Sequence, residues 1–323
     1  MKDYNFFGAA GADIKDSRGL TPRDYYDLLS DIWCEYTCAP RMRNEWSKDN
    51  NTKGQCSITA FLMQDIFGGK VLGVPLDDGN YHCFNRVDSC VFDLTSEQFN
   101  KKLAYSDCPE QSREAHFSKA EKKDRYEYLK SELEKKFLKT FYAKNRNEWR
   151  KWLCDNFEKD SEIWFVFPTV DSGEEGVIYN DAVEEALCFG WIDSTAKTLD
   201  KTHHIRHFTP RKKGSPYSRP NIERLIFLDS KGMLHPKVKE EVKDLINAPF
   251  VFPEDILREI KKDKDAWKNY QSFAEPYKRI RVAYIDAARK RPAEFEKRLN
   301  NFIEKTKKNK LIVGYGGSEK YYK

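Results

Sequence analysis

The first hundred residues carry a hydrophobic pattern that predicts a helix followed by a small antiparallel sheet. Residues 56–67 form an apolar run with helical spacing, which ends at two glycines. Two strand-like segments follow at 70–76 and 81–87, and the residues between them, 77–80, read Asp-Asp-Gly-Asn. This is a turn sequence typical of β-hairpins. A third short strand is expected at 90–94, so the pattern predicts a compact α+β domain.

The second half of the chain shows a different succession of helices and strands. A second α+β domain is therefore predicted at 138–250. It is expected to begin with an amphipathic helix at 147–153 and a buried strand at 162–168. A helix follows at 180–191, ending at Gly190, then a strand at 205–211 and a helix that starts near Ser218. After Pro253 the pattern is helical only, which predicts an all-helical, basic tail at 251–323.

Between these halves the composition becomes highly charged. Leu129, Leu133 and Phe137 recur at helical spacing, and opposite charges lie three or four residues apart. We therefore predict a connecting helix over 111–137, which would leave 1–110 as the first domain. Because acidic and basic residues balance there, this segment is not expected to bind nucleic acid.

Composition limits the class of protein. A length of 323 residues is sufficient for two domains, and 14% aromatic residues indicate folded cores. No apolar stretch approaches the ~20 residues needed to span a bilayer, and the N-terminus lacks the apolar segment of a signal peptide. We expect a cytoplasmic protein with no membrane span. The net charge of +5 reflects a basic tail, but no nucleic-acid motif accompanies it, so nucleic acid is an unlikely partner.

Chemistry is suggested by three residues of the first domain. Cys56 opens the apolar helix, where unpaired backbone N–H groups and the helix dipole favour a thiolate. His82 and Asp93 follow in strand-like sequence. Cysteine, histidine and carboxylate in this order are the parts of an activated thiol nucleophile.

The hairpin register decides whether these residues meet. If the loop at Asp88-Ser89 has two or four residues, Arg86 pairs with Val91 and Phe84 with Asp93. His82 and Asp93 are then diagonal neighbours on one face. A three-residue turn would place them on opposite faces.

Each of the three residues also has a structural interpretation. Cysteine on an apolar helix is often a core residue, and a strand histidine is often structural. Asp93 could end a strand before a helix in which Thr95 and Gln98 form a capping box. Two functions follow from these alternatives: a thiol enzyme, or a non-catalytic protein that binds an unknown peptide or small-molecule ligand.

The segment from about 20 to 103 resembles the YunG family of small bacterial proteins. The resemblance rests on Trp33, the Gly-Gln-Cys tripeptide, the following apolar run, the Tyr81-His82 pair and the Asp93–Phe99 segment. The order of Cys, His and Asp is also similar to papain-like and transglutaminase-like folds, which is an analogy of fold. In papain-like enzymes the oxyanion glutamine stands several residues before the cysteine, whereas Gln55 is adjacent. Backbone amides at the helix start are therefore the favoured oxyanion donors, with Gln55 in support.

The segment from about 141 to 312 resembles the YdeI/OmpD-associated family, also called bacteriocin-protection proteins. The resemblance rests on Tyr179, the run 184–193, Phe208-Thr-Pro-Arg211 and the helical tail. It implies a role in stress or antimicrobial-peptide tolerance and no catalytic residue. Aromatic, charged and amide side chains near its loops could line a binding pocket; these are Trp191, Asp193, Arg206, Arg211, Ser215 and Asn221. Alternatively, Trp191 is a core residue and Arg211 pairs with Asp193.

The sequence predicts no metal and no cofactor. The eight cysteines are scattered, and Cys34 with Cys38 has no second pair at the spacing of a structural zinc site. His203, His204 and His207 lie in one strand, where only alternate residues share a face. We interpret them as part of a partly exposed strand.

Overall fold

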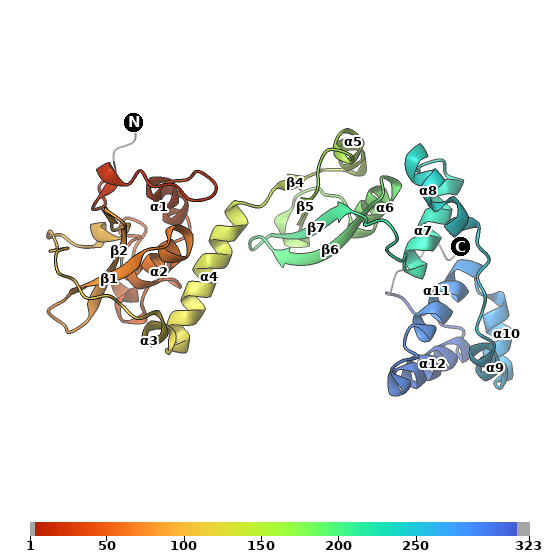
Figure 1. Ribbon diagram of the computed structural model, residues 1–323. Helices are drawn as coiled ribbons and strands as arrows, with labels where there is room; N and C mark the ends of the chain where they lie inside the picture. Colours follow the sequence, from red (N-terminus) through yellow and green to blue (C-terminus); the bar gives the residue numbers. More distant parts are fainter. Residues whose placement is uncertain (1–3, 315–323) are drawn as a thin grey trace. The chain divides into compact units, whose positions relative to one another are not determined.

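A computed structural model describes residues 4–314 of the chain. It forms two compact units, the first ending at Leu138 and the second beginning at Lys139. Each unit has its own sheet and its own helices (Figure 1). The α+β class expected from the sequence is confirmed.

The first unit combines a three-stranded antiparallel sheet with helices. The strand order is β1-β2-β3, with β1 at Lys70–Pro75, β2 at Tyr81–Val87 and β3 at Cys90–Phe92. The helices and 3₁₀ turns are α1 (Pro22–Ser30), α2 (Cys56–Phe67), α3 (Arg113–Phe117), α4 (Ala120–Lys136), η1 (Ala9–Gly11), η2 (Pro40–Glu45) and η3 (Ser96–Gln98).

The hairpin register agrees with the sequence prediction. Arg86 lies opposite Val91 and Val87 opposite Cys90, so the turn between β2 and β3 has two residues. Asp88, the first of them, has a φ of 51°, as turns that match strand twist require. Two positions further along the strands from the Arg86–Val91 pair, this register brings Asp93 opposite Phe84.

Helix α2 packs on the sheet and forms the centre of the first hydrophobic core. Ile58, Phe61 and Leu62 on α2 are buried together with Phe92. At its end, Gly68 adopts a φ of 75°, a backbone conformation that favours glycine. The helix is thereby fixed against β2, with its first residue facing the strand that carries His82.

Helix α4 belongs to the first unit. Tyr126, Leu129 and Leu133 are buried in the same core as α2. The segment that we expected to connect two domains therefore lies along the first one, because its apolar stripe covers α2 while its charged residues, apart from the buried Arg125, are exposed or half-buried.

The second unit begins with a four-stranded sheet of order β4-β5-β7-β6. Only the β4–β5 pair is parallel. The strands and the helices packed on them are β4 (Thr140–Tyr142), α5 (Arg146–Asn156), β5 (Ile163–Pro168), η4 (Val170–Ser172), α6 (Tyr179–Cys188), β6 (Trp191–Thr198), β7 (His203–Pro210), α7 (Arg219–Ser230) and α8 (Pro236–Asn247).

Beyond Pro253, the residues that the structure describes form helices only. These are α9 (Glu254–Lys261), α10 (Lys264–Ser272), α11 (Glu275–Asp286) and α12 (Pro292–Lys307). They enclose a separate small core that includes Ile256, Tyr277 and Phe302. Helix α11 also contacts α7, and Arg279 of α11 donates to the buried carboxylate of Glu223 on α7 at 2.7 and 2.8 Å.

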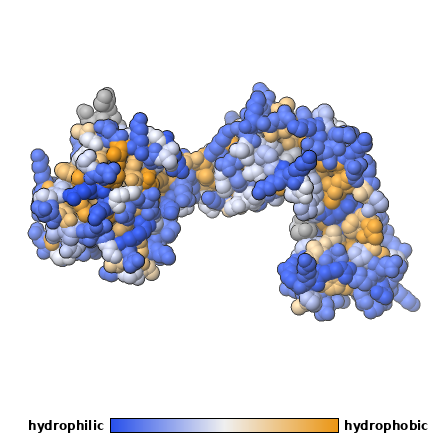
Figure 2. All heavy atoms as spheres, in the orientation of Figure 1, coloured by the Kyte–Doolittle hydropathy of each residue, from blue (hydrophilic) through white to orange (hydrophobic). Residues whose placement is uncertain are grey.

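Polar residues cover most of the face of each unit that Figure 2 shows, with hydrophobic residues in smaller patches. Among residues 4–314, no helix combines the length and the apolar character that crossing a membrane requires.

Candidate active site

His82 and Asp93 meet inside the first unit. The Nε2 of His82 lies 2.5 Å from the Oδ2 of Asp93, and the two residues are 1% and 2% exposed. A carboxylate can only accept a hydrogen bond, so Nε2 carries the proton and Nδ1 remains for a second partner. Burial lowers the pKa of His82, but Asp93 and the Cys56 thiolate outweigh it and raise this pKa to about 10.

Neighbouring residues hold the carboxylate of Asp93 in place. The backbone N–H and the hydroxyl of Thr95 both donate to Oδ1 at 3.0 Å, and the Tyr105 hydroxyl donates to Oδ2 at 2.8 Å. The backbone N–H of Asp93 donates to the carbonyl of Phe7 at 3.0 Å. Thr95 therefore serves this carboxylate and does not cap η3. A charge so deeply buried is stable only with such a full set of partners.

Cys56 is the first residue of α2 and is partly exposed. Its thiol interacts with the thiol and the backbone N–H of Cys83 and with the imidazole of His82. A hydrogen bond from Cys83 is the main cause that lowers the pKa of Cys56; burial opposes it and His82 adds to it. The same contact raises the pKa of Cys83. The favoured state is thus a Cys56 thiolate beside a His82 imidazolium, with Cys83 as a neutral donor.

Gln98 is a site residue that sequence reasoning interpreted only as a helix cap. Its Oε1 accepts from the backbone N–H of Gly54 at 3.3 Å, and its Nε2 donates to the carbonyl of Thr95 at 2.8 Å. These two partners fix the orientation of the amide. Its NH₂ group therefore faces the Nδ1 of His82, at 3.5 Å. Gln98 joins the loop before Cys56 to the loop after Asp93.

Gln55 is placed differently from the support role that we expected. It is fully buried, and its Nε2 donates to the carbonyl of Cys34 at 3.1 Å. Its Oε1 has no partner among the described residues. Because the side chain donates into the interior, the backbone amides of the α2 start are better placed to bind an oxyanion.

Cys56 opens onto a cleft of about 400 Å³ in the first unit. Its lining includes residues 39–42, the turn at Gly79–Tyr81 and residues of α4. Arg125 on α4 is 2% exposed and donates to the carbonyls of Thr37 and Gly54 at 2.7 and 3.0 Å. It thus fixes the loop that leads into Cys56. The charged pattern of 111–137 gave no sign of this contact.

The six candidate binding residues of the second unit differ in burial and in partners. Trp191 is fully buried, and its Nε1 donates to the Phe157 carbonyl at 3.1 Å. It is a core residue with no surface for a ligand. Asp193 accepts from Tyr179 at 2.8 Å and from Arg206 at 3.0 Å, so its partner is Arg206 and not Arg211.

The remaining three residues make local contacts. Arg211 lies 3.7 Å from the centre of the Tyr217 ring and donates to the Ser215 hydroxyl at 3.3 Å. Asn221 accepts from Arg224 at 2.8 Å. The Nε atoms of Arg206 and Arg211 are buried and have no partner among the described residues.

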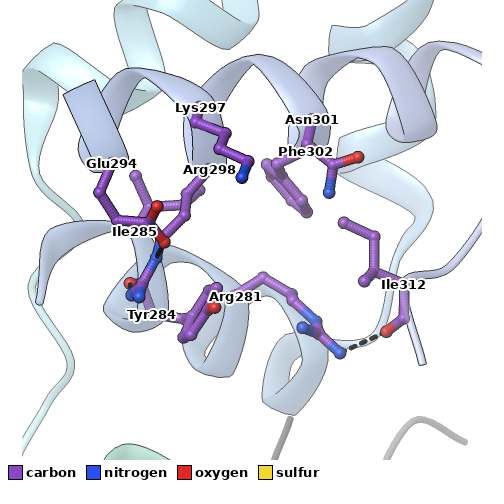
Figure 3. Close-up of a pocket in the computed structure, with 9 residues that line it drawn as sticks. All are labelled: Arg281, Tyr284, Ile285, Glu294, Lys297, Arg298, Asn301, Phe302 and Ile312. Carbon is purple, nitrogen blue, oxygen red and sulfur yellow. Dashed lines mark hydrogen bonds and ion pairs between the residues drawn. The ribbon is translucent and has the colours of Figure 1, made fainter. Parts of the chain in front are cut away.

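A second cavity, of about 240 Å³, lies in the helical region between α11 and α12 (Figure 3). Arg298 donates to Glu294 and to the Tyr284 carbonyl, both at 2.7 Å, and Arg281 donates to the Ile312 carbonyl. The cavity lining contains no cysteine, serine or histidine. It lacks the nucleophile and base that the Cys56 cleft combines.

The described residues contain no cluster of three or more His, Cys, Asp or Glu that could hold a metal. His203 contacts Asp200 at 3.0 Å, His207 contacts Glu162 at 2.9 Å, and His204 stacks on Phe167. The three histidines of β7 therefore have separate partners.

Comparisons with known proteins agree with both family resemblances. Residues 21–138 match the family model "YunG protein", and residues 249–309 match "Bacteriocin-protection, YdeI or OmpD-Associated". Residues 141–241, which we expected to share the second resemblance, match a separate model, "Domain of unknown function (DUF8412)". The uncharacterized protein YunG of Bacillus subtilis (strain 168) is 29% identical over 103 residues, which cover 32% of this chain and 83% of that protein. No solved structure matches the chain significantly.

Proposed function

We propose that the first unit is a cysteine hydrolase or acyltransferase that uses Cys56, His82 and Asp93. The main support is one contact system: a buried His82–Asp93 pair at 2.5 Å that interacts with a cysteine at a helix start, where the cysteine lines a cleft. Papain-like and transglutaminase-like folds place these groups in a similar way, and we extend that analogy to this unit as part of the proposal.

In the proposed mechanism, the Cys56 thiolate attacks an acyl carbon and forms a C–S bond. The carbonyl electron pair moves to oxygen, and the resulting oxyanion accepts hydrogen bonds from the first backbone N–H groups of α2. The tetrahedral intermediate then expels an amine or alcohol, which takes the proton that His82 carries on Nδ1. His82 remains aligned through Asp93.

The thioester that results reacts with water or with an acceptor amine or alcohol. His82, now neutral at Nδ1, accepts a proton from that nucleophile as it attacks. Collapse of the second intermediate breaks the C–S bond and restores the thiolate and the imidazolium. Water gives a hydrolase and another acceptor gives an acyltransferase, so the same residues serve both reactions.

The experiment is acyl trapping on the full chain with p-nitrophenyl acetate. We expect release of p-nitrophenol and one acetyl group on the peptide that contains Cys56, with both lost in Cys56→Ser. Cys154→Ser is the matched control, because Cys154 is an exposed cysteine of the second unit. Acetylation that falls equally on Cys56 and Cys154 would contradict the proposal and favour a non-catalytic role as a ligand-binding protein.

For the second unit we propose a contribution to stress or antimicrobial-peptide tolerance. The support is the match of residues 249–309 to a family whose description names bacteriocin protection. We propose a cytoplasmic location, in which the eight free cysteines stay reduced. The test compares bacteria that express the full chain or a chain with Glu223→Ala, which breaks the α7–α11 contact, for survival of a cationic antimicrobial peptide. Equal survival of both strains and of a strain with empty vector would contradict this role.

A further inference from the structure

The cleft at Cys56 has an unequal charge lining. Four cationic side chains line it, from Arg41, Lys119, Lys122 and Arg125, against the single carboxylate of Glu121. Glu121 is engaged by Arg125 at 2.8 Å, and Arg41 is paired with Asp78 at 3.2 Å.

The two lysines keep their charge free for a ligand. Neither Lys119 nor Lys122 forms an ion pair with a carboxylate of residues 4–314, although both line the cleft. Lys122 contacts the Nδ1 of His116 at 3.3 Å. Burial and the neighbouring cations lower the pKa of His116 to about 3, so this imidazole is neutral. Its buried Nε2 has no partner in the described part of the chain.

Glu121 attracts Lys122 but is also engaged by Arg125, so the cations of the lining outnumber its carboxylate and repel one another, and an anion reduces that repulsion. Burial and the charges of Lys119 and Arg125 lower the pKa of Lys122, which is the effect expected of such a group. A neutral or cationic ligand would leave this repulsion in place. The lining therefore discriminates by charge.

We propose that the cleft takes an acyl substrate that carries a carboxylate or phosphate group, which Lys119 and Lys122 bind while Cys56 meets the acyl carbon. This inference rests on the proposed thiol chemistry and adds the class of substrate to it. Arg125, whose guanidinium is held by backbone carbonyls and Glu121, contributes fixed positive charge to the lining of the cleft.

The test compares two alkylating agents of similar size, anionic iodoacetate and neutral iodoacetamide, on the full chain. Each forms one S–C bond at Cys56 and releases iodide. The ratio of the two rates cancels the thiolate fraction and reports the charge of the cleft. We expect the double variant Lys119→Gln/Lys122→Gln to lower the iodoacetate-to-iodoacetamide ratio by about fivefold, an estimate for two partly screened charges.

Lys123→Gln is the matched control, because Lys123 is an exposed lysine of the same helix that does not line the cleft. It should leave the ratio unchanged. The imidazolium of His82 is present in every variant, so its own attraction for iodoacetate does not enter the comparison. A ratio that the double variant leaves unchanged would overturn the anionic substrate and leave the thiol chemistry standing.

Protection experiments separate the two kinds of anion. Sodium phosphate and sodium acetate are added at equal ionic strength, with sodium chloride as reference, and Cys56 modification by iodoacetamide is followed. Stronger slowing by phosphate assigns a phosphate group, and stronger slowing by acetate assigns a carboxylate; absence of slowing by either overturns the inference. A Cys56 that reacts with neither reagent faster than Cys154 overturns the proposed function and, with it, this inference.

Discussion

Cys56 and Cys188 are two helix cysteines beside charged groups, and their surroundings have opposite effects. Cys56 begins α2 and its pKa is lowered, chiefly by the Cys83 hydrogen bond and further by His82. Cys188 ends α6 and is 0% exposed; burial, together with the Glu185 carboxylate, raises its pKa to about 12. The helix dipole favours an anion at the first position and opposes one at the last.

The difference teaches that buried charge alone does not make a site. The carboxylates of Glu184 and Glu185 on α6 are as buried as Asp93, but they are engaged by Arg146 and Arg150 of α5. That network ties two helices together, and the Cys188 thiol beside it is fully buried. In the first unit, His82 contributes one nitrogen to Asp93 and keeps the other for a thiol that reaches a cleft.

The largest expected effect is therefore a difference in thiol reactivity. At pH 7, Cys56 should react with iodoacetamide at least ~1,000-fold faster than Cys188, because a pKa near 12 leaves only a trace of thiolate. The measurement is alkylation for a series of times, followed by peptide mass mapping. In urea both cysteines should react at similar rates, which serves as the control. Similar rates in the folded protein would remove the distinction between the two sites.

A smaller effect is expected in the pH dependence of stability. Between pH 6.5 and 9, the unfolded chain carries one proton on this pair, on the Cys56 thiol, and the folded chain also carries one, on His82. Because the proton numbers are equal, the pair contributes no pH dependence there. Below pH 6.5 the unfolded state binds the extra proton, so stability falls as pH falls. Above pH 9 the Cys56 thiol of the unfolded chain loses its proton, whereas His82 of the folded chain keeps its proton until it titrates at about 10. The free energy of unfolding therefore falls as pH rises.

Cys56→Ser removes the thiol and exposes the contribution of His82 alone. In the variant the pKa of His82 is raised by Asp93 only, so His82 gives its full stabilisation below pH 6.5 and loses it as pH rises through this folded pKa. The variant should thus lose stability between pH 6.5 and 9 relative to the wild type. Urea unfolding followed by circular dichroism at several pH values measures the difference, and titrating groups that do not contact Cys56 cancel because both proteins share them. Parallel curves over that range would show that Asp93 alone does not keep His82 charged once the thiol is gone.

The first site could be anticipated because hairpin geometry is local. The sequence 88–89 allows a two-residue turn, and that turn alone determines that Arg86 faces Val91 and that His82 and Asp93 share a face. The helix start at Cys56 follows from the apolar run that it opens. These relations span few residues, so strand and helix periodicity is sufficient to predict them.

Contacts between distant segments could not be anticipated in this way. The pairing of Arg125 with the Gly54 carbonyl joins α4 to the loop before Cys56, 71 residues earlier, and nothing in the charge pattern of α4 selects this arginine. Trp191 was a candidate pocket residue because it lies beside a loop, with a core position as the alternative, and tertiary packing buries it. The partner of Gln55 is likewise set by the chain fold at Cys34.

The smallest expected effect concerns Gln98. Gln98→Met keeps the side-chain length but removes the hydrogen bonds to Gly54 and Thr95. We expect the lost hydrogen bonds to have contributed about 1 kcal/mol to the free energy that holds the site in its reactive arrangement. That loss corresponds to roughly a fivefold fall in the limiting alkylation rate of Cys56. Gln64→Met is the matched control, since Gln64 donates to the Gly69 carbonyl at the other end of α2.

The pH profile distinguishes positioning by Gln98 from a role in charge stabilisation. The Gln98 NH₂ group faces the Nδ1 of His82 as a donor, so it gives no stabilisation to a protonated Nδ1. Gln98→Met should therefore lower the limiting rate without raising the pH at which half of that rate is reached. A rise in that midpoint would mean that Gln98 supports the imidazolium, and the amide orientation fixed by Gly54 and Thr95 would then have to be reversed.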